Sequence, residues 1–236
     1  MPEEPKYEKT ILCLANSRRP GGRCVAGKEI VNGKIGSWIR PINAENGHAI
    51  SEADLQYENG TSADVPDIVT IPMLESRPHA HQTENHLIAS DYYWEKQSTA
   101  TWDQIKDATD KVPGPLWLNL ESSFHGVNDK IPQAAANSLT SSLLLIAPSK
   151  LEISVGKESQ YGGGSKRKVR AKFQLNGALY NFVVTDPWAE AEYFAGADGS
   201  YKINEARLCI SLAEAINGLA IKLVATLLTP DRIATE

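Results

Sequence analysis

The chain has 236 residues, of which 42% are apolar and 22% are charged, and this ordinary globular composition suits one large or two small domains. Its N-terminus is polar and lacks the apolar core of a signal peptide, and its apolar runs are too short to span a bilayer. A cytoplasmic protein with no membrane partner is therefore expected. Three widely spaced cysteines (Cys13, Cys24 and Cys209) form no CxxC pair and indicate buried thiols in a reducing compartment.

The net charge of −5 is unevenly distributed along the chain. Residues 16–40 hold six basic and one acidic side chain, and residues 150–185 hold seven basic and two acidic ones. Residues 41–130 hold five basic and fifteen acidic side chains. Because local fields govern the binding of polyanions, the two basic segments keep nucleic acid open as a partner. Pairing of basic strands with acidic neighbours inside the fold would explain the same distribution.

The first half of the chain is predicted to form short strands separated by turns. Asn32-Gly33 is a strong hairpin signal. The segment 16–23 contains Pro-Gly-Gly and is expected to be a loop. Strands are predicted at 10–15, 24–31, 37–42 and 66–73, and helices at 101–110 and 131–139. Thr99 or Thr101 is expected to cap the first helix, and Asn128 or Asp129 the second.

The second half is predicted to be almost entirely β. Strands at 143–147 and 150–156 are expected to pair with each other around Pro148, and 160–165 is a glycine-rich loop. The segment 167–175 alternates basic or polar with apolar side chains, and Asn176-Gly177 predicts a second hairpin. Further strands are predicted at 179–185, 208–212 and 218–228.

Each half thus holds about five short strands with a hairpin turn and a basic strand or loop, which favours a small barrel present twice. The predicted fold class is all-β with minor helix, as two OB-like β-barrels. The expected barrels span 10–90 and 141–230. A helical and irregular region at 91–140 connects them, and 1–9 and 231–236 are tails.

Several long runs carry a family resemblance, among them ILCLANSRRPGGRCVAGKEI, GSWIRPIN, QTENHLI, KRKVRAKF and LCISLAEAINGLAIKLVA. They resemble the prokaryotic dual OB-containing domain proteins, which are discussed alongside prokaryotic conflict and defence systems, and the similarity runs from about Thr10 to Leu228. The resemblance implies two OB-like barrels and a nucleic-acid- or nucleotide-binding role. It implies no reaction, because no catalytic residues can be carried over.

Three groups of residues are candidates for binding nucleic acid. In the first, the planar guanidinium groups of arginines lie next to glycines, whose backbone N–H groups a phosphate can approach closely. In the second, an exposed aromatic ring can stack on a base. In the third, a strand with one cationic face can bind a phosphate backbone. The alternatives are an ordinary charged turn, a core tryptophan and a solvated strand face. The candidates are Arg18, Arg19, Arg23 and Lys28 in the first group, Trp38 and Arg40 in the second, and Lys166, Arg167, Lys168, Arg170 and Lys172 in the third.

The histidines are weaker candidates. His79, His81 and His86 could bind a metal if one strand aligned their rings, but no second ligand cluster is visible. Glu84 and His86 together with His125 and Asp129 could form a nuclease-like set only if the fold brought them together. No nucleophile motif and no cofactor motif occurs, so no cofactor is expected.

The favoured hypothesis is a non-enzymatic module of a prokaryotic defence or conflict system that binds single-stranded DNA or RNA. One alternative is a protein-interaction or nucleotide-sensor module that partners an effector encoded nearby. A second alternative is a metal-dependent phosphodiesterase. Fold alone does not choose among them.

Overall fold

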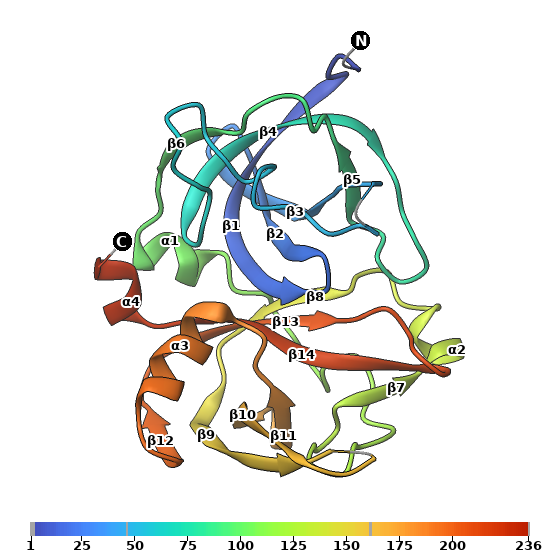
Figure 1. Cartoon of the computed structure of the whole chain (residues 1–236), viewed down its shortest axis with the longest axis vertical. Coiled ribbons are helices and arrows are strands. Elements are labelled where there is room, and N and C mark those ends of the chain that lie inside the picture. Colours follow the sequence, from blue (N-terminus) through green and yellow to red (C-terminus); the bar gives the residue numbers. More distant parts are fainter. Residues whose placement is uncertain (1–2, 46, 161, 236) are drawn as a thin grey trace. The chain divides into compact units, whose positions relative to one another are not determined.

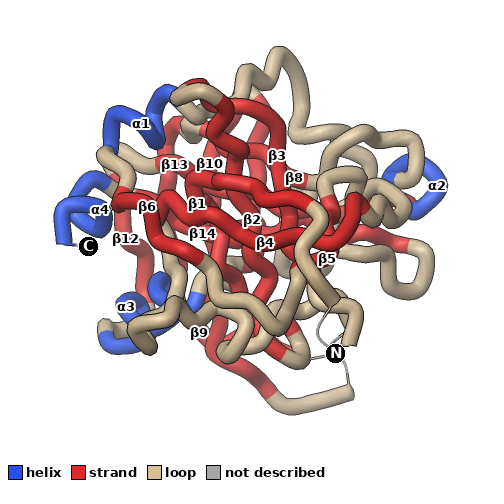
Figure 2. Tube along the Cα trace, turned by 90° about the horizontal axis from the view of Figure 1, so that it is seen from above, coloured by secondary structure: helices blue, strands red, loops and turns tan. Residues whose placement is uncertain are grey.

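The computed structural model of the chain describes residues 3–45, 47–160 and 162–235, so Tyr161 of the expected glycine-rich loop lies outside the described residues. The chain forms two compact units (Figure 1). Unit 1 comprises residues up to Ala108, Thr140–Ser142 and the segment from Asp231, and unit 2 comprises Thr109–Leu139 and Leu143–Pro230. The expected connecting region at 91–140 is thus divided between the units. Strands make up most of the trace (Figure 2), which confirms the predicted β-rich fold class.

Unit 1 is a closed barrel. The order β1-β2-β3-β5-β4 is closed by pairing of β1 with β4, and β6 adds to β4 outside this ring. All ring contacts are antiparallel except that between β3 and β5, which is parallel. The elements are β1 (Tyr7–Arg19), β2 (Gly22–Val31), β3 (Lys34–Ile42), β4 (Asp67–Ser76), β5 (Asn85–Ile88), β6 (Glu95–Thr99) and α1 (Trp102–Asp107).

The predicted turns of unit 1 are partly confirmed. Asn32 and Gly33 both have positive φ, 50° and 72°, as a tight hairpin between twisted strands requires. The expected loop at 16–23 is wrong in extent: β1 continues to Arg19, and only Pro20-Gly21 forms the turn. Asn16 to Arg19 pair in register with β2, so the polar run before the turn is strand. Thr101 caps α1 through a capping box with Gln104, as predicted.

Unit 2 repeats the same ring with different strands. Its first ring strand is broken at Pro148: the part before the proline pairs with β13 and the part after it with β10. A parallel bridge between Val184 and Val224 joins the end of β11 to β14 and closes the ring. The elements are β7 (Lys130–Pro132), α2 (Gln133–Ala136), β8 (Leu143–Ile146), β9 (Ser149–Ser159), β10 (Ser165–Leu175), β11 (Ala178–Val183), α3 (Pro187–Ala195), β12 (Gly199–Ile203), β13 (Arg207–Leu212) and β14 (Leu219–Leu228); the described chain ends in α4 (Pro230–Thr235).

The ring order in unit 2, with β8 and β9 together as the first strand, is therefore β9-β10-β11-β14-β13-β8. It matches β1-β2-β3-β5-β4 of unit 1 strand for strand. The match includes the one parallel contact of each ring, which joins β3 to β5 in unit 1 and the end of β11 to β14 in unit 2. A Greek-key ring of this kind is the OB-type barrel. The prediction of a small barrel present twice is confirmed in topology.

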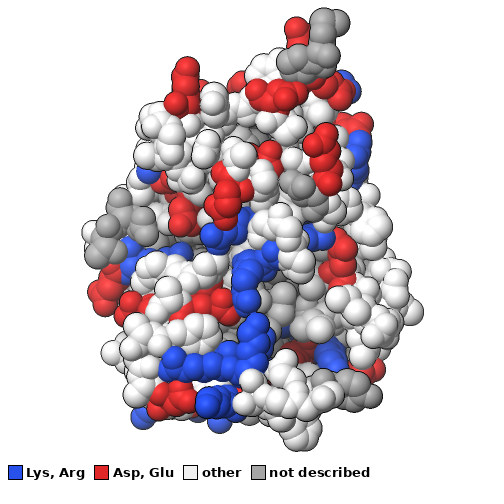
Figure 3. Space-filling model, in the orientation of Figure 1, with Lys and Arg blue, Asp and Glu red and all other residues white. Residues whose placement is uncertain are grey.

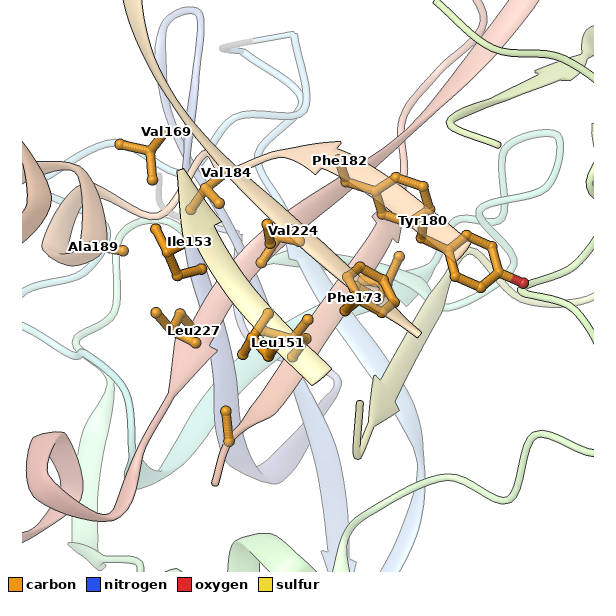
Figure 4. Packing of buried hydrophobic residues seen from close by; sticks show 14 of the residues in the cluster. Leu151, Ile153, Val169, Phe173, Tyr180, Phe182, Val184, Ala189, Val224 and Leu227 are labelled. Atoms are coloured by element: carbon orange, nitrogen blue, oxygen red, sulfur yellow. The ribbon is translucent and has the colours of Figure 1, made fainter. Parts of the chain in front are cut away.

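The core of unit 2 lies inside its ring (Figure 4). Alternate residues of β9, β10 and β11 point inward, so Ile153, Val169 and Phe182 are fully buried while their neighbours face out. Phe173 stacks on Tyr180 with ring centroids 5.3 Å apart, and Phe182 meets both rings edge-on. The Tyr180 hydroxyl points out of this cluster in Figure 4.

Three expectations for unit 2 need correction. The strands at 143–147 and 150–156 do not pair with each other, because the chain bends at Pro148 and each pairs elsewhere. The helix expected at 131–139 shrinks to α2, since Lys130–Pro132 is strand. Asp129 accepts hydrogen bonds from Ser123 and does not cap α2. The helix α3 was not predicted; it begins at Pro187 with Asp186 as its N-cap.

We predict that Gly27→Ala destabilises the protein strongly, by at least about 2 kcal/mol. A Cβ at Gly27 of β2 would lie 2.2 Å from the Leu12 carbonyl oxygen of the paired strand. Gly156→Ala is the matched control, because Gly156 is also a strand glycine without positive φ and its Cβ would meet nothing within 4 Å. Urea denaturation measures both free energies of unfolding. Similar losses in the two variants would contradict the prediction.

Candidate functional site

The first candidate site is a polar hollow of about 530 Å³ on unit 1. Strands β1, β2, β3 and β5 meet there with the segment that precedes β5. Clefts of this volume accept a small organic group such as a nucleoside. The lining residues are Lys9, Glu29, Ser37, Trp38, Ile39, Thr83, Glu84, His86, Thr140 and Ser141.

The hollow lies at the mouth of the unit 1 barrel. Lys9 sits two residues before the fully buried Ile11 on β1, and Glu29 pairs with Ile11 in register, so both point to the same side of the sheet as this core residue. The Lys9 Nζ is 2.8 Å from Glu29 Oε1, and both side chains are about a quarter exposed or less. An ion pair thus sits at the point where the barrel interior opens to solvent.

His86 of β5 forms another wall of the hollow. Its Nδ1 is 2.8 Å from the Tyr7 hydroxyl, and the two rings meet edge-on. Burial, and then the nearby Lys9 ammonium, lower the pKa of His86, while the Glu29 carboxylate acts in the opposite direction. Burial and the Glu75 carboxylate raise the pKa of Tyr7. A neutral imidazole and a protonated phenol are the resulting forms near neutral pH.

Glu84, which lines the hollow, forms a buried ion pair with Arg40. The Arg40 guanidinium lies 3.2 Å from Glu84 Oε1, with side chains 1% and 4% exposed. The Ser142 hydroxyl donates to Glu84, and Arg40 donates to Ser142 Oγ at 2.8 Å. The Thr83 hydroxyl donates to the Thr140 carbonyl at 2.6 Å. These bonds hold residues 140–142 beside the residues that precede β5.

Trp38 and Arg40 therefore have different roles, although they were predicted to act together. Arg40 is buried and ion-paired, so it is not presented to a ligand in this structure. Trp38 is half-exposed, lines the hollow, and has the Lys28 Nζ 5.5 Å from its ring centroid. Lys28 itself is only 6% exposed.

The first basic segment mostly stabilises its own hairpin. Arg19 donates to the Gly47 carbonyl, and Arg23 pairs with Glu52 at 2.8 Å. The backbone of Arg23 also forms a bridge with Ile50, over Gly22. Arg18 is exposed at the end of β1. The hairpin is thus tied to residues 47–52 by the groups that were predicted to hold phosphate.

The second candidate site is the outer face of the sheet β11-β10-β9-β12 in unit 2. Lysines on β10 and β12 share this face, since Lys172 and Lys202 both lie opposite Glu152 of β9. Basic side chains gather over β9 and β10 in Figure 3. The described structure records no ion pair for Lys166, Lys172 or Lys202, and all three are exposed. We call Lys166, Lys168, Lys172 and Lys202 the lysine face.

The two arginines of β10 have structural partners instead. Arg170 forms a bidentate ion pair with Glu158, and the two side chains are 12% and 16% exposed. Arg167 donates to the carbonyls of Phe194 and Gly196 and pairs with Asp198, which fixes the end of α3. The predicted basic strand is therefore divided between arginines that bond within the unit and lysines that face outward.

An exposed aromatic lies in the loop beside the lysine face. The Phe124 side chain is 92% exposed and contacts the His125 ring edge-on. Asn181 of β11 donates to the His125 carbonyl at 2.8 Å, and Asn181 lies opposite Lys172 on β10. His125 Nε2 is 3.3 Å from Ser159 Oγ. The loop that carries Phe124 is thus fastened to this sheet.

A buried lysine in unit 2 stabilises the segment before this loop. Lys222 is fully buried; its Nζ donates to the Leu118 carbonyl at 2.6 Å and lies 5.8 Å from the Tyr180 ring centroid. The Tyr180 hydroxyl accepts from the backbone N–H of Leu116 and from Asn119. Burial lowers the pKa of Lys222 to about 8, and the Asp129 carboxylate opposes this shift.

The histidine candidates do not form a metal site among the described residues. The His79 ring meets His48, His81 is buried, and His86 bonds to Tyr7. The proposed nuclease-like set is divided: Glu84 and His86 belong to unit 1, and His125 and Asp129 to unit 2.

Within the described chain no helix has both the length and the apolar character to cross a membrane.

Sequence reasoning missed most of the hollow. Tyr7, Lys9, Glu29, Ser37 and Thr83 were not predicted as site residues. The alternation Tyr7, Lys9, Ile11 does place two polar side chains in line with a core residue, but only the register of four strands shows that they meet.

A family model described as the dual OB-containing domain matches residues 9–227, which is nearly the whole chain. The chain belongs to this family. The match confirms the resemblance seen in the sequence and agrees with the two rings of equal topology. No curated protein and no solved structure matches the chain significantly. The dual OB-containing family thus supplies a binding fold, and the ligand must be inferred from the sites.

In this dual OB-containing chain, we predict that Arg40→Met costs about 3–5 kcal/mol of stability, because it leaves Glu84 buried without its cation. Arg77→Met is the matched control, since Arg77 pairs with Glu75 on the surface, where both side chains are more than two-fifths exposed. That loss should stay within about 1 kcal/mol. Urea denaturation measures the free energy of unfolding of both variants. Equal losses would contradict the conclusion that the Arg40–Glu84 pair stabilises the fold from within.

The lowered pKa of Lys222 predicts a pH-dependent stability. Between about pH 8 and the ordinary lysine pKa of 10.5 the unfolded chain binds this proton and the folded chain does not, so the free energy of unfolding rises with pH across this window. The full gain is up to about 3 kcal/mol. Lys222→Met lacks this gain, so its stability relative to the wild type should fall from pH 7.5 to 10 in urea titrations. A constant difference would contradict the prediction.

Proposed function

We propose that the chain is a single-stranded nucleic-acid-binding module whose phosphate contacts come from the lysine face of unit 2. The observation that carries the proposal is the set of outward lysines on one sheet of an OB-type barrel, beside the 92% exposed Phe124. Strand faces of such barrels commonly bind oligonucleotides.

The chemistry of this face suits a flexible polyanion. Lysine ammonium groups act as point charges that follow a phosphate backbone, and an exposed ring can stack a base of any sequence. The carboxylates of β9 compete weakly, since Glu158 is bound to Arg170 and Glu152 is a single carboxylate opposite two lysines, Lys172 and Lys202. A role in a prokaryotic defence system remains part of this proposal and rests on the family resemblance.

The proposal predicts salt-dependent binding that is lost on charge reversal. A fluorescently labelled dT12 oligonucleotide, followed by anisotropy, should bind more weakly as NaCl rises, because phosphate contacts release counterions. Lys166→Glu with Lys172→Glu should weaken binding at least about tenfold and reduce the slope of log K against log salt by about 2.

The control is Lys34→Glu with Lys111→Glu, which makes the same change in net charge at exposed lysines outside the lysine face. It should leave the affinity within about threefold, because direct contacts outweigh long-range attraction at physiological salt. Equal weakening by both pairs, or binding that does not respond to salt, would remove the lysine face as the interface.

A further inference from the structure

The hollow of unit 1 is not explained by phosphate binding. It contains two carboxylates, Glu29 and Glu84, and each is neutralised by one cation, Lys9 or Arg40. A polyanion would gain little there, since the local charges already balance. The hollow instead offers hydrogen-bonding groups of both kinds within the volume of one nucleoside.

The arrangement at the barrel mouth is a carboxylate with donors beside it. Glu29 presents two acceptor oxygens, of which Oε1 meets Lys9. Lys9 carries three N–H donors. His86 lines the same wall, and its Nδ1 lies 2.8 Å from the Tyr7 hydroxyl. In the tautomer in which the hydroxyl donates to Nδ1, the Nε2–H of the neutral imidazole adds another donor. Ser37 and Thr83 supply hydroxyls at the rim.

We propose that this hollow binds a guanine base of the single-stranded nucleic acid, with Glu29 accepting from its N1–H and N2 amino groups and Lys9 or His86 donating to its O6. Trp38, which lines the same hollow, supplies an aromatic face for stacking. The inference rests on the proposed nucleic-acid-binding function and adds base specificity to it.

The carboxylate is the feature that selects guanine. Only guanine among the common bases places two N–H donors side by side on its Watson–Crick edge, which matches the two oxygens of a carboxylate. Adenine and cytosine place a ring-nitrogen acceptor beside the amino group, and uracil or thymine flanks one N–H with two carbonyls. Each of those edges would point an acceptor at Glu29, and an unpaired buried acceptor is costly. Single-stranded bases are commonly read on this edge.

The test uses the full chain and labelled ten-nucleotide oligonucleotides of thymidine in which the central three positions are guanine, adenine, cytosine or inosine. Anisotropy at fixed salt gives the four affinities. The guanine oligonucleotide is expected to bind at least about tenfold more tightly than the adenine or cytosine ones. Inosine, which lacks the N2 amino group, should fall between guanine and adenine.

Variants locate the preference in the hollow. Glu29→Gln should reduce the guanine-to-adenine ratio of affinities to below about threefold, and Glu29→Asp, which keeps the carboxylate, should reduce it less. Glu8→Gln is the matched control: Glu8 is an exposed carboxylate next to Lys9 on β1, outside the hollow lining, and the ratio should not change. Thermal melts of all variants verify that each is folded, and the comparison of ratios cancels any general loss of binding.

The outcomes separate the two proposals. Equal affinity of the wild type for all four oligonucleotides would overturn guanine recognition and leave nucleic-acid binding intact. A guanine preference that persists in Glu29→Gln would also overturn the assignment, because the reading site would lie elsewhere. No binding of any oligonucleotide would remove the proposed function itself, and guanine recognition with it.

Discussion

Closure of each sheet into a ring is the constraint on which the rest of the structure depends. In unit 1, β1 must pair with β2 along one edge and with β4 along the other, so it runs for 13 residues and contains a bulge between Cys13 and Ala15. Unit 2 meets the same demand by breaking the strand at Pro148. Closure removes exposed edges, and it also creates barrel mouths where an inward-facing side chain can be polar.

Barrels of so few strands need long connections, and buried cations hold those connections in place. The guanidinium of Arg40 and the hydroxyl of Ser142 meet on Glu84, which fixes residues 140–142. In unit 2, the buried Lys222 holds the segment at Leu118. Each cation supplies donors to carbonyl or carboxylate oxygens that would otherwise be buried without a hydrogen bond. Counting basic residues along a chain therefore overestimates the charge available to a ligand.

Local signals in the sequence predicted the two Asn-Gly hairpin turns, the alternation of β10 and the capping of α1, because these depend on neighbouring residues alone. The strands β6 and β12 were missed because EKQST and GSYKI are polar and show no apolar alternation. The burial of Arg40 could not be predicted, since its partner Glu84 lies far along the chain and reaches it through the parallel contact of β3 with β5. The hollow was missed for the same reason: its ion pair and its Tyr7–His86 bond each join different strands, and only register aligns them.

Five arginines bond within their own unit, whereas Lys166, Lys172 and Lys202 are exposed on one sheet face, and this difference explains how an acidic chain can present a cationic face. Arg19, Arg23, Arg40, Arg167 and Arg170 all bond to carbonyl or carboxylate oxygens of their own unit. A planar guanidinium with five donors suits such fixed partners, whereas a lysine ammonium stays hydrated on a flexible stem. The surface charge left for a polyanion is thus supplied by lysines, whose contacts depend on salt but not on sequence. Base specificity then has to come from groups of fixed geometry, and the ion pair and imidazole at the mouth of the unit 1 barrel are held by their strands in that way.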